Sequence, residues 1–358
     1  MTEVNNIIQV KRNAIGFLDQ YPSENTIYHY NLIFRDYLSC INDIPHDKDG
    51  KLGIIRADLS RVANEYFSIR RDFRADVERY FASIKNRPPI TIRTYLAVVR
   101  VFLRENDVEL GELFWKRLNK KIKGNRPLTL DLVPTNKELQ TMLSDMPLHG
   151  KALFLFLATS GCRIGETLQL SISDINFKTD PVQINISGRL TKTGNSRITF
   201  ITSECAEMIK EWLATRPQFI EHRGMPVNDT RLFPFDNHVA SLMFANGLKR
   251  AGLVERDSST NRYRVHIHVL RKFFRTRLGA VMNSDFTEAL IGHEDHLKEV
   301  YARYSIEDIA KEYKKSEHAL AVFPNDTTVK TLTEDVTMLK GIVAKFFQIG
   351  ENAQKIMK

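Results

Sequence analysis

The sequence predicts a two-domain protein, with a helical first half and a second half that is mainly α-helical around a small antiparallel β-sheet. Its 358 residues are enough to form two separate apolar cores. Apolar side chains recur at helical spacing in both halves, whereas 182–187 and 197–202 alternate apolar and polar residues as a hairpin does. We therefore expect one domain at 1–125 and another at 134–323.

Residues 1–125 are expected to be helical because their apolar side chains recur at intervals of three and four. In the segment 91–104 (TIRTYLAVVRVFLR) these side chains share one face, and Thr91, which follows two prolines, is predicted to cap the helix. The segments 28–38 and 59–67 show the same period.

The segment 116–126 has six basic residues and no acidic one, and prolines follow it, so we expect 116–133 to be an interdomain linker. Each Lys or Arg near a phosphate releases a counterion, so a cationic linker suits a protein that contacts duplex DNA. A solvated spacer has the same composition. The candidate DNA-binding residues are Lys116, Arg117, Lys120, Lys121, Lys123 and Arg126.

The charge balance of the whole chain points the same way, since Lys and Arg exceed Asp and Glu by nine. Such a surplus favours a nucleic-acid partner, although a merely soluble basic protein also has it. The cysteines, Cys40, Cys162 and Cys205, are far apart and are expected to be free thiols in a reducing compartment. No apolar run has the length of a membrane span and no signal peptide is present, so we expect an intracellular, cytoplasmic protein.

The second half is expected to begin with a helix through 153–158 that ends at Ser160 and Gly161. The hairpin turn contains Thr193, Gly194 and Asn195, which are residue types that favour turns. Further helices are predicted at 204–213, 239–250, 268–281 and 286–291.

The segment 326–358 has a heptad pattern of its own. Val329 and Val336 begin a seven-residue repeat, and Leu332 and Leu339 occupy the intervening positions. This pattern predicts a coiled coil or a helix that docks on a neighbouring subunit, and a helix that packs on its own domain fits equally well.

Two basic residues stand where the chain changes direction. Arg163 lies between one helix and the next, where backbone N–H groups already favour phosphate, and Glu166 three residues later is placed to orient it. Lys192 lies in the hairpin turn, from which a lysine can reach a DNA strand and protonate a leaving oxygen. Each residue alone is more often a salt-bridge or surface residue.

Two further motifs follow on predicted helices. His268 and Arg271 in HVLR lie on one helix face, where one group can exchange a proton and the other can hold charge. In LIGH, Gly292 ends a helix and presents His293, and Tyr301 and Tyr304 follow. A tyrosine hydroxyl attacks phosphorus when a base and several cations surround it. Each motif is common by chance.

The ordered set of TSGCRIGETLQLSISDI, the Lys192 hairpin, HVLR and LIGH followed by tyrosine resembles the tyrosine recombinase (phage integrase) family. The resemblance covers 134–313 well, and the helical first half resembles the family's core-binding domain more loosely. It implies a two-domain clamp on double-stranded DNA, strand exchange by a homotetramer, and cleavage without a metal or nucleotide cofactor. The absence of a G-x-x-x-x-G-K-[ST] loop agrees with this.

The resemblance also implies a role for each residue. Arg163 and Arg271 would clamp the scissile phosphate and stabilise its transition state. Lys192 would protonate the leaving 5′-oxygen, His268 would assist proton transfer from the tyrosine, and His293 would bind a phosphate oxygen.

The tyrosine nucleophile is the open point in this assignment. Tyr301 follows His293 by eight residues and Tyr304 follows it by eleven, against a commoner family spacing of nine. The stretch YARYSIEDIAKEY also resembles a family variant with the nucleophile at its start, which favours Tyr301 and leaves Tyr304 as the rival.

Three other interpretations remain. A metal site formed by His266, His268, His293 and His296 is disfavoured, because Arg271 is a poor neighbour for a cation. A type IB topoisomerase-like nicking and closing enzyme uses the same residue types without strand exchange. A DNA-binding relative that has lost catalysis would keep the fold, but the full set of catalytic residue types argues against it.

Overall fold

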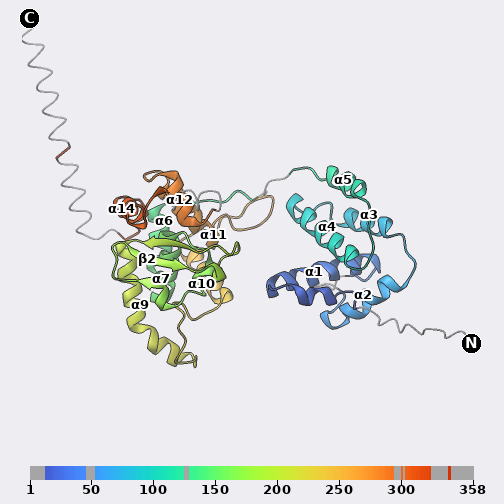
Figure 1. Cartoon of the computed structure of the whole chain (residues 1–358), viewed down its shortest axis with the longest axis horizontal. Helices are drawn as coiled ribbons and strands as arrows, with labels where there is room; N and C mark the ends of the chain where they lie inside the picture. The colour runs from blue at the N-terminus through green and yellow to red at the C-terminus, as the bar shows by residue number, and fades with distance from the viewer. Residues whose placement is uncertain are drawn as a thin grey trace, which may run out of the picture. The chain divides into compact units, whose positions relative to one another are not determined.

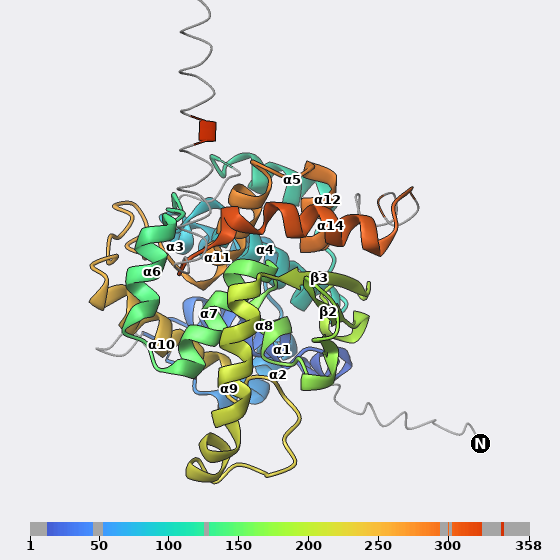
Figure 2. The ribbon, with the colours of Figure 1, turned by 90° about the vertical axis from the view of Figure 1, so that its left-hand side faces the viewer.

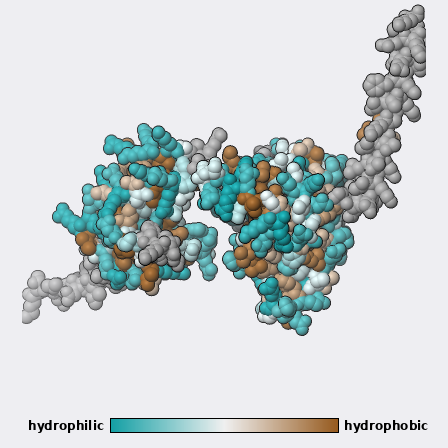
Figure 3. All heavy atoms as spheres, turned by 180° about the vertical axis from the view of Figure 1, so that it is seen from behind, coloured by the Kyte–Doolittle hydropathy of each residue, from teal (hydrophilic) through white to brown (hydrophobic). Residues whose placement is uncertain are grey.

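The protein is described by a computed structural model that places residues 13–45, 53–124, 129–293, 300, 303–323 and 338–339. The chain divides into two compact units, Met1–Thr129 and Leu130–Lys358, each with its own apolar core (Figure 1). On the face that Figure 3 shows, hydrophilic side chains predominate on each unit and apolar side chains are scattered among them. Within the described part of the chain, no helix is long and apolar enough to cross a membrane.

The N-terminal unit is a helical bundle around an aromatic core. Its helices are α1 (Glu24–Ile41), α2 (Leu59–Ser68), α3 (Phe73–Ile84), α4 (Pro89–Arg104) and α5 (Glu112–Lys120). The rings of Phe34 on α1 and Phe102 on α4 stack with their centroids 4.5 Å apart, and both side chains are fully buried. The buried Tyr80 hydroxyl donates to Asp36 over 2.7 Å, which satisfies a polar group that burial would otherwise penalise.

Two details of this unit differ from the sequence-based expectation. Helix α4 begins at Pro89, so Thr91 lies inside the helix and does not cap it; proline suits the first helical position because it lacks the N–H that would be unpaired there. Helix α3 lies within the half expected to be helical but is not one of the segments named there, and its start is capped by Asp72, which accepts from the backbone N–H groups of Arg74 and Ala75.

The basic segment is a third difference, because its first part is not a linker. Trp115, Leu118 and Ile122 are spaced by three and four residues and are buried in the core of the N-terminal unit. Residues 112–122 therefore belong to this unit, as helix α5 and the turn after it. Of the candidate DNA-binding residues, Lys116, Arg117, Lys120, Lys121 and Lys123 are exposed, and Arg126 lies outside the described residues.

The C-terminal unit confirms the prediction of helices around a small antiparallel sheet. Its helices are α6 (Asn136–Ser144), α7 (Leu148–Ser160), α8 (Ile164–Thr167), α9 (Ser203–His222), α10 (Asn237–Arg250), α11 (Ile267–Leu278), α12 (Ser284–Ile291) and α14 (Ile306–Ser316). Helix α7 is at the centre, is buried without interruption from Ala152 to Ser160, and contacts α6, α9, α10, α11 and the sheet. Figure 2 shows α9 and the sheet beside it.

The sheet has the order β1-β2-β3, formed by Ile175–Asn176, Val182–Ile186 and Arg197–Ile201. Strands β2 and β3 are the predicted hairpin, with Ile186 paired to Arg197 at the end next to the connecting turn. The connection between them is longer than a tight turn and contains a 3₁₀ turn at Gly188–Leu190. Gly194 has a φ of 78°, so the predicted glycine occupies the left-handed position. The heptad segment 326–358 lies outside the described residues except for 338–339.

Candidate active site

Arg163 occupies the sharp junction between α7 and α8. Gly161 ends α7 with a φ of 67°, and a Cβ on it would come within 2.6 Å of the ring of Phe274, so only glycine fits there. Arg163 then caps α8 and remains partly exposed. Glu166 accepts from the Arg163 backbone N–H at 3.0 Å and from its Nη1 at 2.8 Å, which is the orienting contact that the sequence spacing predicted.

A second arginine, which the sequence analysis did not single out, completes this arrangement. Arg197 on β3 is buried, donates from Nη2 to Glu166 Oε2 at 2.6 Å, and donates from Nε to the Leu290 carbonyl at 3.2 Å. Burial acts to raise the pKa of Glu166, but the hydrogen bonds from Arg197 and Arg163 outweigh it and lower the pKa overall. A charged residue at an inward position of a half-buried strand was the available signal.

Arg271 on α11 joins the same junction from the other side. Its Nη1 donates to the Gly161 carbonyl at 2.6 Å, its Nη2 donates to the Ile291 carbonyl, and the side chain is buried. Burial, followed by the charges of Arg163 and Arg197, lowers the pKa of Arg271 to about 10. The group still carries its charge at neutral pH, so three guanidinium groups and one carboxylate gather where α7, α11 and α12 meet.

His268 precedes Arg271 by nearly one helical turn and is exposed. Its pKa is lowered by partial desolvation and then by the positive charges of Arg271, His266, Lys272 and Arg163. The imidazole is therefore mainly uncharged at neutral pH and can accept a proton.

His293 follows α12, which ends at Gly292 with a φ of 80°. Its Nδ1 contacts a Glu288 oxygen, and the other Glu288 oxygen accepts from Arg275 Nε at 2.5 Å. Glu288 thus fixes one ring nitrogen of His293 and leaves Nε2 as the nitrogen with which the ring can bind another group.

The remaining predicted residues are less closely tied to this cluster. Lys192 is exposed in the connection between β2 and β3. Tyr304 is 43% exposed, and its ring packs edge-on against Phe286 with the centroids 4.7 Å apart. Tyr301 lies outside the described residues. The structure therefore brings together Arg163, Arg271, His268 and His293, and it does not place the preferred nucleophile.

The histidines that could suggest a metal site have other partners. His266 contacts Asp131 at 3.2 Å and His293 contacts Glu288, whereas His296 lies outside the described residues. Among the residues that the structure places, no three His, Cys, Asp or Glu side chains are grouped so that they could hold a metal ion.

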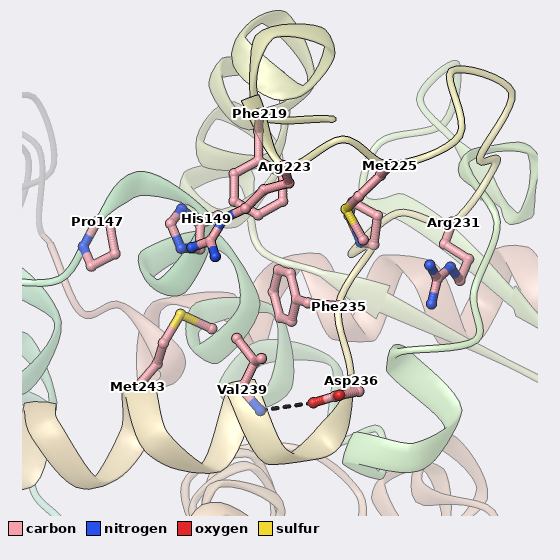
Figure 4. A pocket seen from close by; sticks show the side chains of 11 residues that line it. Pro147, His149, Phe219, Arg223, Met225, Arg231, Phe235, Asp236, Val239 and Met243 are labelled. Atoms are coloured by element: carbon pink, nitrogen blue, oxygen red, sulfur yellow. Dashed lines mark hydrogen bonds between the residues drawn. The ribbon is translucent and has the colours of Figure 1, made fainter. Parts of the chain in front are cut away.

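The C-terminal unit also has an apolar cavity of about 640 Å³. The ring of His149 packs beside those of Phe219 and Phe235, with centroid distances of 5.0 and 5.9 Å, and Arg223 lies next to it (Figure 4). Burial and the charge of Arg223 lower the pKa of His149. None of the described catalytic candidates lines this cavity, so it is a separate feature of the fold.

The family is decided by the sequence of this same unit. Residues 134–310 match the model of the phage integrase family. The chain belongs to the phage integrase family. The matched residues include Arg163, Lys192, His268, Arg271 and His293, and this tyrosine recombinase therefore carries its candidate site within the family's own domain.

Known proteins similar to this tyrosine recombinase include the TnP I resolvase of Bacillus thuringiensis, 24% identical over 195 residues that make up 52% of this chain and 67% of the resolvase. Similar solved structures include the XerH site-specific recombinase bound to difH substrate, 15% identical over 79% of this chain and 94% of that one, with a TM-score of 0.48. A lambda integrase (75–356) dimer bound to a COC′ core site is 18% identical over 82% and 89%, with a TM-score of 0.44.

Proposed function

We propose that this tyrosine recombinase cleaves and rejoins double-stranded DNA at specific sites through a 3′-phosphotyrosyl intermediate, without a metal or nucleotide cofactor. The observation that carries the proposal is the meeting of Arg163 and Arg271 at Gly161, the residue that ends α7. Two guanidinium groups that are charged at neutral pH and held at one helix junction suit a scissile phosphate, which gains charge as it is attacked.

Each remaining residue has one task in this reaction. The tyrosine oxygen attacks phosphorus as its proton passes to the uncharged imidazole of His268. Lys192 donates a proton to the 5′-oxygen as the P–O bond to it breaks. His293 binds a phosphate oxygen through Nε2, because Glu288 holds its Nδ1. The free 5′-hydroxyl then attacks the phosphotyrosine and restores the DNA backbone, so the bond energy is conserved.

We assign the nucleophile to Tyr301. The packing of the Tyr304 ring against Phe286 supports this choice, because a nucleophile at that position would have to leave an aromatic contact to reach the phosphate. Tyr304 remains the rival.

The proposed partners follow from the same chemistry. We assign phosphate contacts to the exposed lysines of α5 and the residues after it, so that both units contact the duplex as a clamp. Exchange between two sites requires four active subunits, so a tetramer forms on DNA. We also propose that the protein acts inside the cell, where its DNA substrate would be found.

The test is single-turnover cleavage of a nicked duplex that carries the protein's own site, followed by mapping of the covalent adduct. Wild type should form an adduct, Tyr301→Phe should form none, and Tyr304→Phe should retain it. An adduct lost only in Tyr304→Phe would reassign the nucleophile. Absence of any adduct in wild type would favour an inactive DNA-binding relative, and relaxation of supercoiled DNA of any sequence would favour a topoisomerase-like enzyme.

A further inference from the structure

The first residues of the C-terminal unit are bound along the segment that leads into α11. The Leu130 N–H donates to Asp257 Oδ2 at 3.1 Å and its carbonyl accepts from Arg264 Nε at 2.9 Å. The Leu132 N–H donates to the Arg264 carbonyl at 2.9 Å. The chain therefore enters this unit against the segment that carries the HVLR motif.

Asp131, between these two anchor points, reaches α11 itself. Its Oδ2 accepts from Lys272 Nζ at 2.5 Å and its Oδ1 lies 3.2 Å from His266 Nε2. The Asp131 side chain is 17% exposed, whereas those of His266 and Lys272 are 41% and 47% exposed. One carboxylate thus holds two residues that flank His268 and Arg271 in the sequence.

We propose that Asp131 is a positioning residue, which fixes helix α11 at both ends of the HVLR motif and so sets the orientation and charge environment of His268. The inference rests on the proposed function, because it assigns significance to His268 and Arg271. It adds a residue, from the start of the unit, that no local motif includes.

Geometry supports the effect on orientation. His266 is the N-cap residue of α11, and its side chain makes no capping hydrogen bond. Its ring lies parallel to that of His268, at an interplanar angle of 3° and a centroid distance of 6.5 Å. Asp131 contacts Nε2 of His266 and so holds the His266 ring in place. The His268 ring lies parallel to that ring, so its surroundings are fixed on this side.

Charge supports the effect on protonation. The charged groups that act on His268 are Arg271 and Lys272 on α11, His266 at its start and Arg163 at the start of α8, and all of them lower its pKa. Burial raises the pKa of Asp131, but contacts with Lys272 and His266 lower it overall, so it is ionised at neutral pH. Asp131 is therefore the carboxylate that contacts two of the groups that lower the pKa of His268, namely Lys272 and His266.

The experiment compares Asp131→Asn and Asp131→Glu with wild type in the full-length protein. The first readout is the titration of the His268 ring followed by NMR in protein labelled at histidine, assigned with His268→Gln. The second is the pH dependence of adduct formation on the nicked duplex. Glu255→Gln is the matched control, because it removes a carboxylate that pairs with Arg264 at 2.5 Å in the same region, whereas the carboxylate that contacts His266 and Lys272 is that of Asp131.

In Asp131→Asn we expect the His268 titration and the acidic limb of the cleavage profile to move to lower pH, since the positive charge of Lys272, which acts on His268, then loses its carboxylate partner. The cleavage rate at neutral pH should fall roughly threefold to tenfold, because small displacements of catalytic groups slow reaction. Asp131→Glu should partly restore the His268 titration and the cleavage rate, and Glu255→Gln should change neither of these quantities.

An unchanged His268 titration in a folded Asp131→Asn protein would overturn the inference while leaving the proposed function intact. A loss of rate that tracks a lowered Tm, with no shift of the titration, would also overturn it. If wild type formed no adduct, the proposed function would fail, and the NMR titration would still decide whether Asp131 controls His268.

Discussion

Arg197 Nη2 lies 2.6 Å from Glu166 Oε2, and both side chains are almost fully buried. The pair links β3 to α8 and, through the Leu290 carbonyl, to the end of α12. Three stretches that carry Arg163, Lys192 and His293 are therefore tied to one buried ion pair. Its geometry explains how residues far apart in the sequence are held in one site.

Arg197→Met should destabilise the protein by about 3–5 kcal/mol, because it leaves Glu166 buried without its main partner. Urea unfolding measures this change in the free energy of unfolding. The double variant with Glu166→Gln should recover part of the loss, since no unpaired charge then remains buried. Glu207→Gln on the exposed Lys210 pair should have no measurable effect. Equal losses for Arg197→Met and Glu207→Gln would contradict the structural role.

Gly292→Ala should cost more stability than Gly194→Ala, although the two glycines have φ values of 80° and 78°. Both alanines would bear the strain of a left-handed residue, about 1–2 kcal/mol. At Gly292 the new Cβ would also lie 2.7 Å from Arg197 Cδ, whereas nothing lies within 4 Å at Gly194. We expect the difference in unfolding free energy to be about 1 kcal/mol or more. An equal loss of unfolding free energy in the two variants would show that the Arg197 side chain shifts away from the new Cβ without cost.

The contribution of Glu166 to stability should disappear in acid. Its pKa is lowered from an ordinary value of 4.5 in the folded protein, so its ionised form stabilises the fold above that pH, and the stabilisation is lost as the pH falls through the folded-state pKa. The difference in unfolding free energy between wild type and Glu166→Gln should therefore shrink between about pH 7 and about pH 3. A difference that grows on acidification would have the wrong sign.

Replacement of Lys120, Lys121 and Lys123 by glutamine should weaken DNA binding and reduce its dependence on salt. For every lysine that binds a phosphate in the wild type, its replacement should lower the slope of log K against log salt by about 0.9. Fluorescence anisotropy at several salt concentrations measures both quantities. Lys210→Gln on α9 tests whether the loss of a positive charge elsewhere on the protein also weakens DNA binding and lowers the slope. An unchanged slope in the triple variant would remove these lysines from the interface.

Deletion of 326–358 should weaken assembly on DNA more than binding to a single half-site, if the heptad pattern there mediates subunit contact. Gel shifts on half-site and full-site duplexes separate the two steps. An equal weakening of both would mean that the segment supports its own domain.

The sequence by itself determined the fold class, the family and the residues Arg163, His268, Arg271 and His293 as candidates. It could do so because helical period, the glycines that end helices and short motifs are local properties, readable within a few residues. The prediction of a linker at 116–122 was wrong for a local reason too. It gave more weight to the basic composition of the segment than to the apolar spacing of Trp115, Leu118 and Ile122.

Only the tertiary structure revealed Arg197 and Asp131. Arg197 meets Glu166 across 31 residues, and Asp131 meets Lys272 across 141. The inward position of Arg197 on its strand indicates that it needs a partner, but the sequence does not identify the partner, because partners are determined by how helices and strands pack. The buried ion pair of Arg197 and Glu166 is thus a property of the packed core, whereas the motifs that it supports are properties of the chain.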